Sequence, residues 1–220
     1  MAEKGRSWAA LARIRQGFHL FFRDSFLPPT DERLEGMQAT ADGLDGLFVE
    51  RFPFARSWRR VVDAFAARPP LESLERQYDA LFDGDPDRPR CQPIESGHLQ
   101  LSELGLAPEY ERLGVSLARV GSVPPDHVAA EFEVMAQLCE RERTAWFDGT
   151  LDDVARTVDL ERDFLWHHLG VWFPEFAMAV EPLASGTVYS TIIEAALGFV
   201  HHDREFVKLL SAAELARVAT

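Results

Sequence analysis

The sequence predicts an all-α protein, a single globular bundle of helices. Apolar residues recur at steps of three and four along most of the chain, the spacing of one face of an α-helix. No alternation of apolar and polar residues longer than a few positions indicates a β-strand, and there is no internal repeat. We therefore expect one domain over residues 1–220. Gly121 and Pro124-Pro125 also predict a hinge near residues 115–125 between two helical halves.

Four helices are expected before the middle of the chain. They cover, in order, residues 8–22, much of 32–47, 58–65 and 71–82. Pro28-Pro29 and Pro69-Pro70 end the first and third, because proline cannot continue a helix. Gly84 closes the fourth, and residues 83–93, rich in Asp, Pro and Arg, predict a surface loop.

The second part of the chain is expected to be helical as well. The predicted segments are residues 94–104, 108–117, a long helix from Pro124-Pro125-Asp126, then 151–158, 159–183, 187–209 and a short piece at 212–218. The long helix is the clearest. Its apolar face contains Val128, Phe132, Met135 and Leu138. Asp126 is expected in its first turn, where the helix dipole favours a carboxylate.

Composition excludes several classes of function. A formal net charge of −13 argues against binding to nucleic acid or to anionic membrane surfaces. Cys91 and Cys139 lie far apart, which makes a disulfide framework unexpected and a reducing compartment the default. The first residues lack a signal-peptide core, and the most apolar window, residues 187–200, contains Glu194 and is too short to span a bilayer. We expect a cytoplasmic protein.

Catalytic chemistry is not indicated. His167-His168 and His201-His202 are adjacent pairs, and neighbours on a helix point about 100° apart, so neither pair can chelate a metal. His127 and Glu131 have the spacing of one helix face, but a third ligand such as Glu133 would face another way. No phosphate-binding glycine loop and no G-x-S-x-G motif occurs. We expect no cofactor, no metal and no enzyme activity.

Four short motifs follow one another in the central part of the chain. They are Tyr78-Asp79-Ala80-Leu81-Phe82; Pro93-Ile94-Glu95-Ser96; Tyr110 and Gly114 followed by residues 125–135, from Pro125-Asp126-His127 to Met135; and Phe164, His168-Leu169, Trp172 and Phe176. Their order and spacing resemble the TorD/DmsD/NarJ family, cytoplasmic chaperones that mature molybdenum-containing oxidoreductases. The resemblance covers residues 74–176. It departs from the family pattern at Gly97-His98 and at Pro124.

The resemblance implies a helical bundle of the TorD type and a system-specific chaperone. Such a protein binds the N-terminal twin-arginine signal peptide, the apo-form of the catalytic subunit, or both. It assists cofactor insertion and prevents premature export by the twin-arginine (Tat) route. Two alternatives stay open: a helical scaffold or regulator with no signal-peptide role, and a helical metalloenzyme using His127, Glu131 and His168.

A leader with two arginines and an apolar stretch requires an acidic rim and an apolar groove. We expect both beside the hinge, as surface carboxylates and an open face of the long helix. The predicted client-binding residues are Asp126, His127, Glu95, Ser96, Tyr110, Glu131, Phe132 and Met135. The expected partners are the apo catalytic subunit and its leader, with no nucleic acid and no membrane insertion. The client, and the choice between a monomer and a domain-swapped dimer, stay open.

Overall fold

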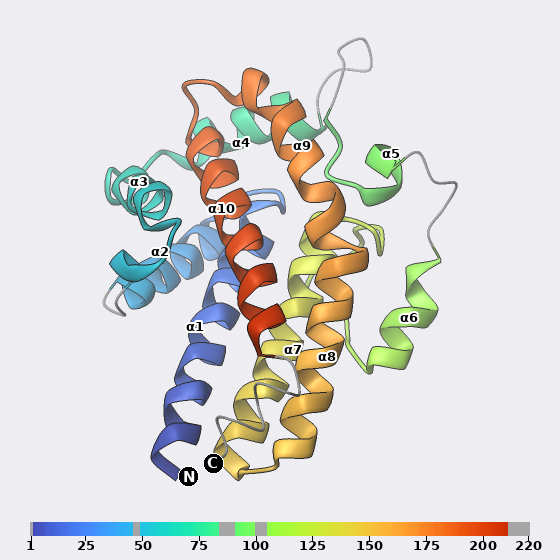
Figure 1. Cartoon of the computed structure of the whole chain (residues 1–220). Helices are drawn as coiled ribbons and strands as arrows, with labels where there is room; N and C mark the ends of the chain where they lie inside the picture. Colours follow the sequence, from blue (N-terminus) through green and yellow to red (C-terminus); the bar gives the residue numbers. More distant parts are fainter. Residues whose placement is uncertain (1, 46–48, 84–90, 100–104, 211–220) are drawn as a thin grey trace.

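The computed structural model describes residues 2–45, 49–83, 91–99 and 105–210, and it is helical throughout (Figure 1). Within these residues the only extended pairing is an isolated antiparallel bridge between Ile94 and His127. The all-α prediction is confirmed. The elements are α1 (Ala2–Ser25), α2 (Asp31–Asp45), the 3₁₀ turn η1 (Val49–Arg51), α3 (Ala55–Ala66), α4 (Leu71–Tyr78), the π turn η2 (Asp79–Asp83), α5 (Glu95–Leu99), α6 (Leu106–Leu113), α7 (Val128–Asp148), α8 (Leu151–His167), α9 (Leu169–Ala184) and α10 (Val188–Leu209).

Helix α7 occupies the centre of the bundle. It packs most extensively along α1, and α8 also lies against it (Figure 1). Every residue from Val128 to Ala136 is buried, so this part of α7 is enclosed on all sides rather than along one stripe. Helices α3 and α9 pack against α10, whereas α5 and α6 lie on the opposite side of the molecule from α2 and α3.

Phenylalanine rings form the core between α1 and its neighbours. Phe18 and Phe22 of α1, and Phe26 directly after its end, follow at steps of four, which places them on one side of the helix. Phe26 stacks on Phe132 of α7 with ring centroids 6.0 Å apart, and Phe22 meets Phe199 of α10 at 5.6 Å. Burial of each such side chain contributes roughly 1.5–3 kcal/mol to folding.

A cluster of charged side chains also lies inside the bundle. The Arg15 guanidinium of α1 donates to carboxylates on three other helices, Glu142 of α7, Glu161 of α8 and Asp203 of α10, each at 2.5 Å. His19 Nε2 lies 2.9 Å from the same Asp203 carboxylate. Burial raises the pKa of Glu161 well above its usual range. Burial also favours a higher pKa for Asp203, but Arg15 and His19 together outweigh it and lower that pKa.

The predicted helix boundaries at residues 158–159 and 117 are wrong. The chain does not break at residues 158–159: α8 continues to His167, because no glycine or proline interrupts it, and the break falls at His168. Helix α6 ends at Leu113 instead of residue 117, because Gly114 adopts a left-handed conformation (φ 62°) that closes the helix. The parts of the predicted loop and helices that fall at residues 46–47, 84–90, 100–104 and 212–218 lie outside the described residues.

The predicted hinge region links α6 to α7 through a series of turns that are attached to α7. The Gln137 side chain accepts from the Ser116 backbone N–H at 3.0 Å and donates to the Ser116 carbonyl at 2.6 Å. Arg141 donates to the carbonyls of Leu113 and Gly114, each at 2.5 Å. These contacts hold the link in the conformation seen here, and the division into two halves stays a prediction.

Candidate functional site

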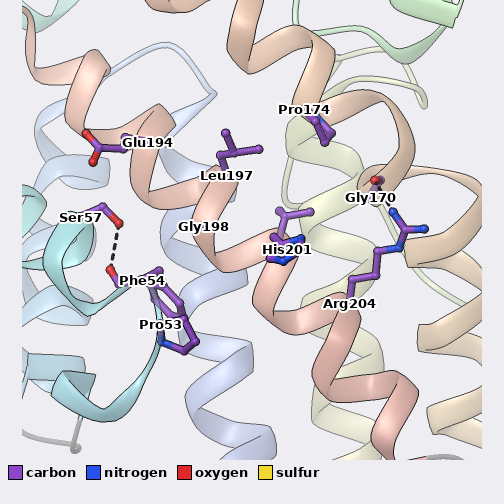
Figure 2. Close-up of a pocket in the computed structure, with 11 residues that line it drawn as sticks. Pro53, Phe54, Ser57, Gly170, Pro174, Glu194, Leu197, Gly198, His201 and Arg204 are labelled. Carbon is purple, nitrogen blue, oxygen red and sulfur yellow. Dashed lines mark hydrogen bonds between the residues drawn. The ribbon is translucent and has the colours of Figure 1, made fainter.

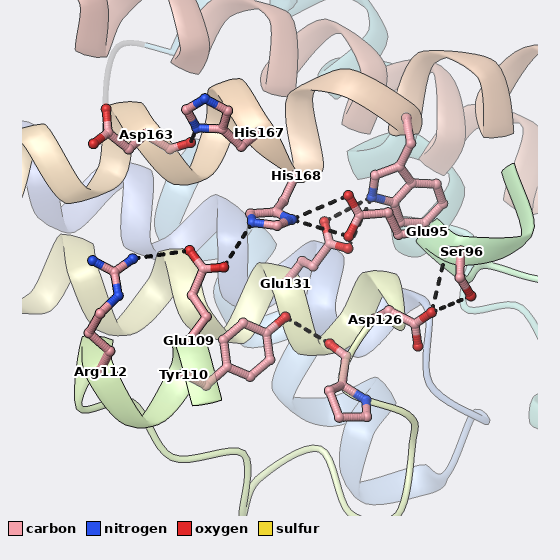
Figure 3. A network of polar contacts seen from close by, with 12 residues as sticks. Glu95, Ser96, Glu109, Tyr110, Arg112, Asp126, Glu131, Asp163, His167 and His168 are labelled. Carbon is pink, nitrogen blue, oxygen red and sulfur yellow. Dashed lines mark hydrogen bonds and ion pairs between the residues drawn. The ribbon is translucent and has the colours of Figure 1, made fainter. Parts of the chain in front are cut away.

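The site is built where the start of α5 meets the start of α7. Around the Ile94–His127 bridge, the Glu95 N–H donates to the Asp126 carbonyl at 2.9 Å, and the Val128 N–H donates to the Pro93 carbonyl at 2.8 Å. Segments about thirty residues apart in the sequence are therefore joined by backbone hydrogen bonds. This joint brings the P-x-E-S and P-D-H motifs side by side (Figure 3).

The Asp126 side chain hydrogen-bonds to α5 and not to α7, the helix that follows Asp126 in the chain. Its Oδ2 accepts from the Ser96 hydroxyl at 2.5 Å and the Ser96 backbone N–H at 3.3 Å, in the first turn of α5. The prediction that Asp126 lies in the first turn of α7 is wrong, because α7 begins at Val128 and His127 is its N-cap. The His127 Nδ1 accepts from the Ala129 N–H at 3.1 Å. Burial lowers the pKa of His127 to about 4, against the opposing effect of Asp126, so the ring is neutral at physiological pH.

A chain of polar contacts runs from the core to the surface (Figure 3). At its inner end, the Trp172 indole N–H donates to both carboxyl oxygens of Glu131, each at 3.0 Å. The Glu95 carboxyl is close enough to Glu131 to raise the pKa of that residue. The His168 Nδ1 lies 3.2 Å from both Glu95 oxygens, and its Nε2 lies 3.2 Å from Glu109 Oε2.

Burial and neighbouring charges determine which side chains of this series of polar contacts carry a proton. Burial and the nearby Glu95 raise the pKa of Glu131 well above its usual range, so Glu131 is a neutral acid. Burial alone would lower the pKa of His168, but Glu95 and Glu109 outweigh it and raise that pKa. The His168 ring, with its raised pKa, lies between the Glu95 and Glu109 carboxyls. Such a chain suits holding helices together and offers no free nucleophile.

Tyr110 closes the site from α6. Its hydroxyl donates to the Pro125 carbonyl at 2.7 Å, which ties α6 to the segment before α7. Burial raises the pKa of Tyr110, and the neighbouring carboxyls of Glu131 and Glu95 raise it further. The hydroxyl is therefore a permanent donor.

The structure brings most of the predicted site residues together, but it buries them. Glu95, Tyr110, Asp126, His127 and Glu131 are all buried, and Ser96 is half-buried. The predicted rim of surface carboxylates is therefore wrong for these residues in this conformation. The predicted open apolar face is wrong as well: Phe132 and Met135 are completely buried, because α1, α8 and α9 pack against α7. Their role in client binding stays a prediction.

Three members of the site, Glu109, His168 and Trp172, were not among the predicted client-binding residues, although His168 and Trp172 belong to the fourth motif. The H-L-x-x-W pattern of His168-Leu169 and Trp172 could have predicted a polar site, since it places a histidine and an indole N–H one helical turn apart. Glu109 precedes Tyr110 in an ordinary surface sequence, and nothing local distinguishes it. Its side chain is 30% exposed and forms the outer end of the polar chain.

Metal binding has no geometric support in the part of the chain that the structure describes. There, no three His, Cys, Asp or Glu side chains are placed to hold an ion together. The described helices also include none with the length and apolar character needed to cross a membrane.

Comparison with known proteins places this site in a family. The model of the nitrate reductase delta subunit family matches residues 52–178, which enclose the whole polar chain. The chain belongs to this family. The predicted relationship to NarJ- and TorD-type maturation proteins is thereby confirmed.

Two named assembly chaperones resemble the chain over most of their length. The chlorate reductase assembly chaperone protein of Ideonella dechloratans is 32% identical over 146 residues, covering 63% of this chain and 74% of the relative. The selenate reductase assembly chaperone protein of Thauera selenatis is 30% identical over 156 residues, covering 66% and 80%. Both relatives are assembly chaperones, so the predicted class, a chaperone and not an enzyme, is confirmed.

A solved structure supports the fold. A redox enzyme maturation protein from Archaeoglobus fulgidus matches with a TM-score of 0.50 and 22% identity, covering 88% of this chain and 93% of that one. At this level of identity the likeness concerns the arrangement of the helices alone.

Proposed function

We propose that this chain is a cytoplasmic assembly chaperone that binds the immature catalytic subunit of a molybdenum-containing reductase. It holds the subunit's N-terminal twin-arginine leader until the cofactor is inserted, and so delays export. The family match across residues 52–178 carries the proposal, because it spans the entire polar site. The names of the two assembly-chaperone relatives support a reductase as the client.

The most accessible carboxylate of the polar chain is the natural contact for the leader's arginines. Glu109 is 30% exposed, and it is held by His168 and, at 3.4 Å, by Arg112. An incoming guanidinium can take the place of Arg112 and pair with both oxygens through its planar fork. Asp126, 8% exposed, is the second contact: its carboxylate gives up the hydrogen bond from the Ser96 hydroxyl and accepts one from the leader's arginine.

Apolar contacts must supply most of the affinity, because an exposed ion pair contributes only about 0–1 kcal/mol. Ile94, directly before α5, and Leu99, the last residue of α5, are half-buried and flank the Glu95 and Ser96 positions. They replace the enclosed Phe132 and Met135 as the first apolar contacts for the leader. A few such contacts, each contributing roughly 1.5–3 kcal/mol less the cost of ordering the peptide, lead to micromolar binding. That strength suits a protein that must release its client.

The test is a titration of a fluorescent twin-arginine leader peptide into the whole protein. Wild type is expected to bind it, and to bind a version with both arginines changed to glutamine about tenfold more weakly. Glu109→Gln should lose the same discrimination. Glu111→Gln, a charge change at an exposed neighbour on α6, should keep it.

A second measurement tests the client itself. Co-expression with a reductase catalytic subunit should yield a complex in which that subunit lacks its cofactor. If folded wild type ignores both the leader and the cofactor-free subunit, the chaperone proposal is wrong. If it binds the subunit but not the leader, the leader-holding role is wrong and the assembly role stands.

A further inference from the structure

A groove on another face of the molecule lies between α9, α10 and the segment before α3 (Figure 2). Its volume is about 570 Å³, within the range of sites that take a small ligand or a few side chains. The walls are largely apolar, with Phe54 and Leu197 facing Pro174. Gly198 allows α10 to approach closely, because a Cβ there would lie 2.8 Å from the Phe54 Cβ.

The apolar surface extends from the groove along α9. Val171 is 40% exposed and Met178 is 67% exposed. They lie three residues before and four residues after Pro174, so all three share one face of α9. Leu183, at the end of the same helix, is 50% exposed. Exposed apolar side chains that adjoin a groove are typical of a surface that binds another polypeptide.

One end of the groove presents an arginine held in a fixed position. Pro174 has no N–H, so the Gly170 carbonyl lacks its usual helical donor, and Arg204 Nη1 donates to it at 3.2 Å. The guanidinium also lies over the Trp166 ring, 4.0 Å from its centroid. Gly170 provides the space, because a Cβ there would lie 3.2 Å from Arg204 Cδ.

The charge of this arginine has no acidic partner in the part of the chain that the structure describes. Within the described residues Arg204 forms no ion pair, and its Nε is buried without a hydrogen-bond partner. At the other end of the groove, by contrast, Glu194 is already paired with Arg60. His201 lines the groove together with Arg204. The acidic residue Glu175 of α9 does not line the groove. The uncompensated charge in the groove is therefore positive, in a chain whose net charge is −13.

We propose that this groove is a second docking site, which takes an apolar segment of a partner polypeptide that carries a carboxylate side chain. The carboxylate pairs with Arg204 beside His201, and the apolar side chains lie against Leu197, Phe54 and Met178. This goes beyond the proposed function, because the site requires a partner segment of the opposite charge from a twin-arginine leader. A chaperone with both sites can hold a leader and a second segment of the client at once.

The experiment uses three twelve-residue amphipathic peptides on the whole protein, measured by fluorescence anisotropy. All have leucines on one helical face, and they differ only in a central Glu, Gln or Lys. The Glu peptide should bind about tenfold tighter than the Gln peptide and more tightly still than the Lys peptide. Arg204→Gln should abolish this order, and Arg156→Gln, the same charge change at an exposed site on α8, should keep it.

Leu197→Glu provides a second test, since this half-buried position can be changed without removing the bonds of Arg204. It should weaken the Glu peptide and strengthen the Lys peptide. The proposal is overturned if the three peptides bind alike, if both variants behave as wild type, or if the twin-arginine leader displaces the Glu peptide. It is also overturned if sedimentation shows a dimer that Leu197→Glu dissociates, because a second copy would then cover the groove. Failure of wild type to bind the leader would leave this test unaffected.

Discussion

Replacing Arg15 by methionine tests whether the buried charge cluster holds the bundle together. The guanidinium is the only cation in direct contact with the carboxylates of Glu142, Glu161 and Asp203 in the described residues, because burial lowers the pKa of His19 beside Asp203. Methionine keeps most of the volume and removes the charge. Loss of Arg15 therefore leaves three buried carboxyls that must either take up protons or remain charged without a cation.

The expected loss is about 3–5 kcal/mol of unfolding free energy at pH 8, the range for removing one partner of a buried ion pair. The Trp146 indole N–H still donates to Glu142 at 2.9 Å, which keeps the loss within this range. The loss should be smaller at pH 5, because protons can then neutralise the carboxyls that Arg15 leaves unpaired. Against a total stability of roughly 5–15 kcal/mol, the variant will be only marginally folded at pH 8.

Urea unfolding followed by circular dichroism at pH 8 and pH 5 measures both effects. Arg60→Met is the matched control, because Arg60 and its partner Glu194 are each about half exposed and their pair contributes about 0–1 kcal/mol. Asp203→Asn placed in the Arg15→Met background should recover part of the loss. If Arg15→Met costs no more than Arg60→Met, or if its cost does not depend on pH, the reasoning is refuted.

The other predictions concern the polar site and the packing of α9. Glu131→Gln should be at least as stable as wild type at pH 8. The folded-state pKa of Glu131 is raised above its unfolded value of about 4.3, so the contribution of the Glu131 carboxyl to stability is lost as pH rises through that raised pKa. Glu131→Ala should lose about 1–3 kcal/mol. His168→Asn should cost most below about pH 6.5, and less as pH rises through the raised folded-state pKa of His168. Gly170→Ala should destabilise by about 1–3 kcal/mol, because its Cβ would lie 2.4 Å from a backbone oxygen. Gly36→Ala, inside α2 with nothing within 4 Å, should stabilise by about 0.5–1 kcal/mol.

Each of these outcomes can be read from the same urea titrations across pH 5–9. A Glu131→Gln variant as unstable as Glu131→Ala would show that the carboxyl is charged in the folded protein. A loss in His168→Asn that grows with pH would reverse the sign argued for the imidazolium. Equal effects at Gly170 and Gly36 would mean that the close approach at the α8–α9 junction is not enforced.

The sequence by itself determined the helices, because their signals are local. The spacing of Phe18, Phe22 and Phe26 indicates a buried helix face wherever that helix packs. The order of the motifs from Tyr78 to Trp172 likewise indicated the family, since motif spacing is a property of the chain alone. Pro28-Pro29 and Pro69-Pro70 marked helix ends correctly, whereas the end at Gly114 was missed and the boundary misplaced at 158–159 lay in a segment without glycine or proline.

Only the tertiary structure decided which of these side chains are accessible and what they bond to. Phe132 and Met135 were expected on an open face, and they are enclosed because other helices cover α7 from several sides. Asp126 was expected to stabilise its own helix, but the backbone bridge next to it brings the start of α5 within hydrogen-bond distance. Whether a side chain is buried, paired or left with an unpaired charge, as at Arg204, depends on which residues from distant parts of the chain pack next to it. The local spacing of apolar residues does not predict these long-range neighbours.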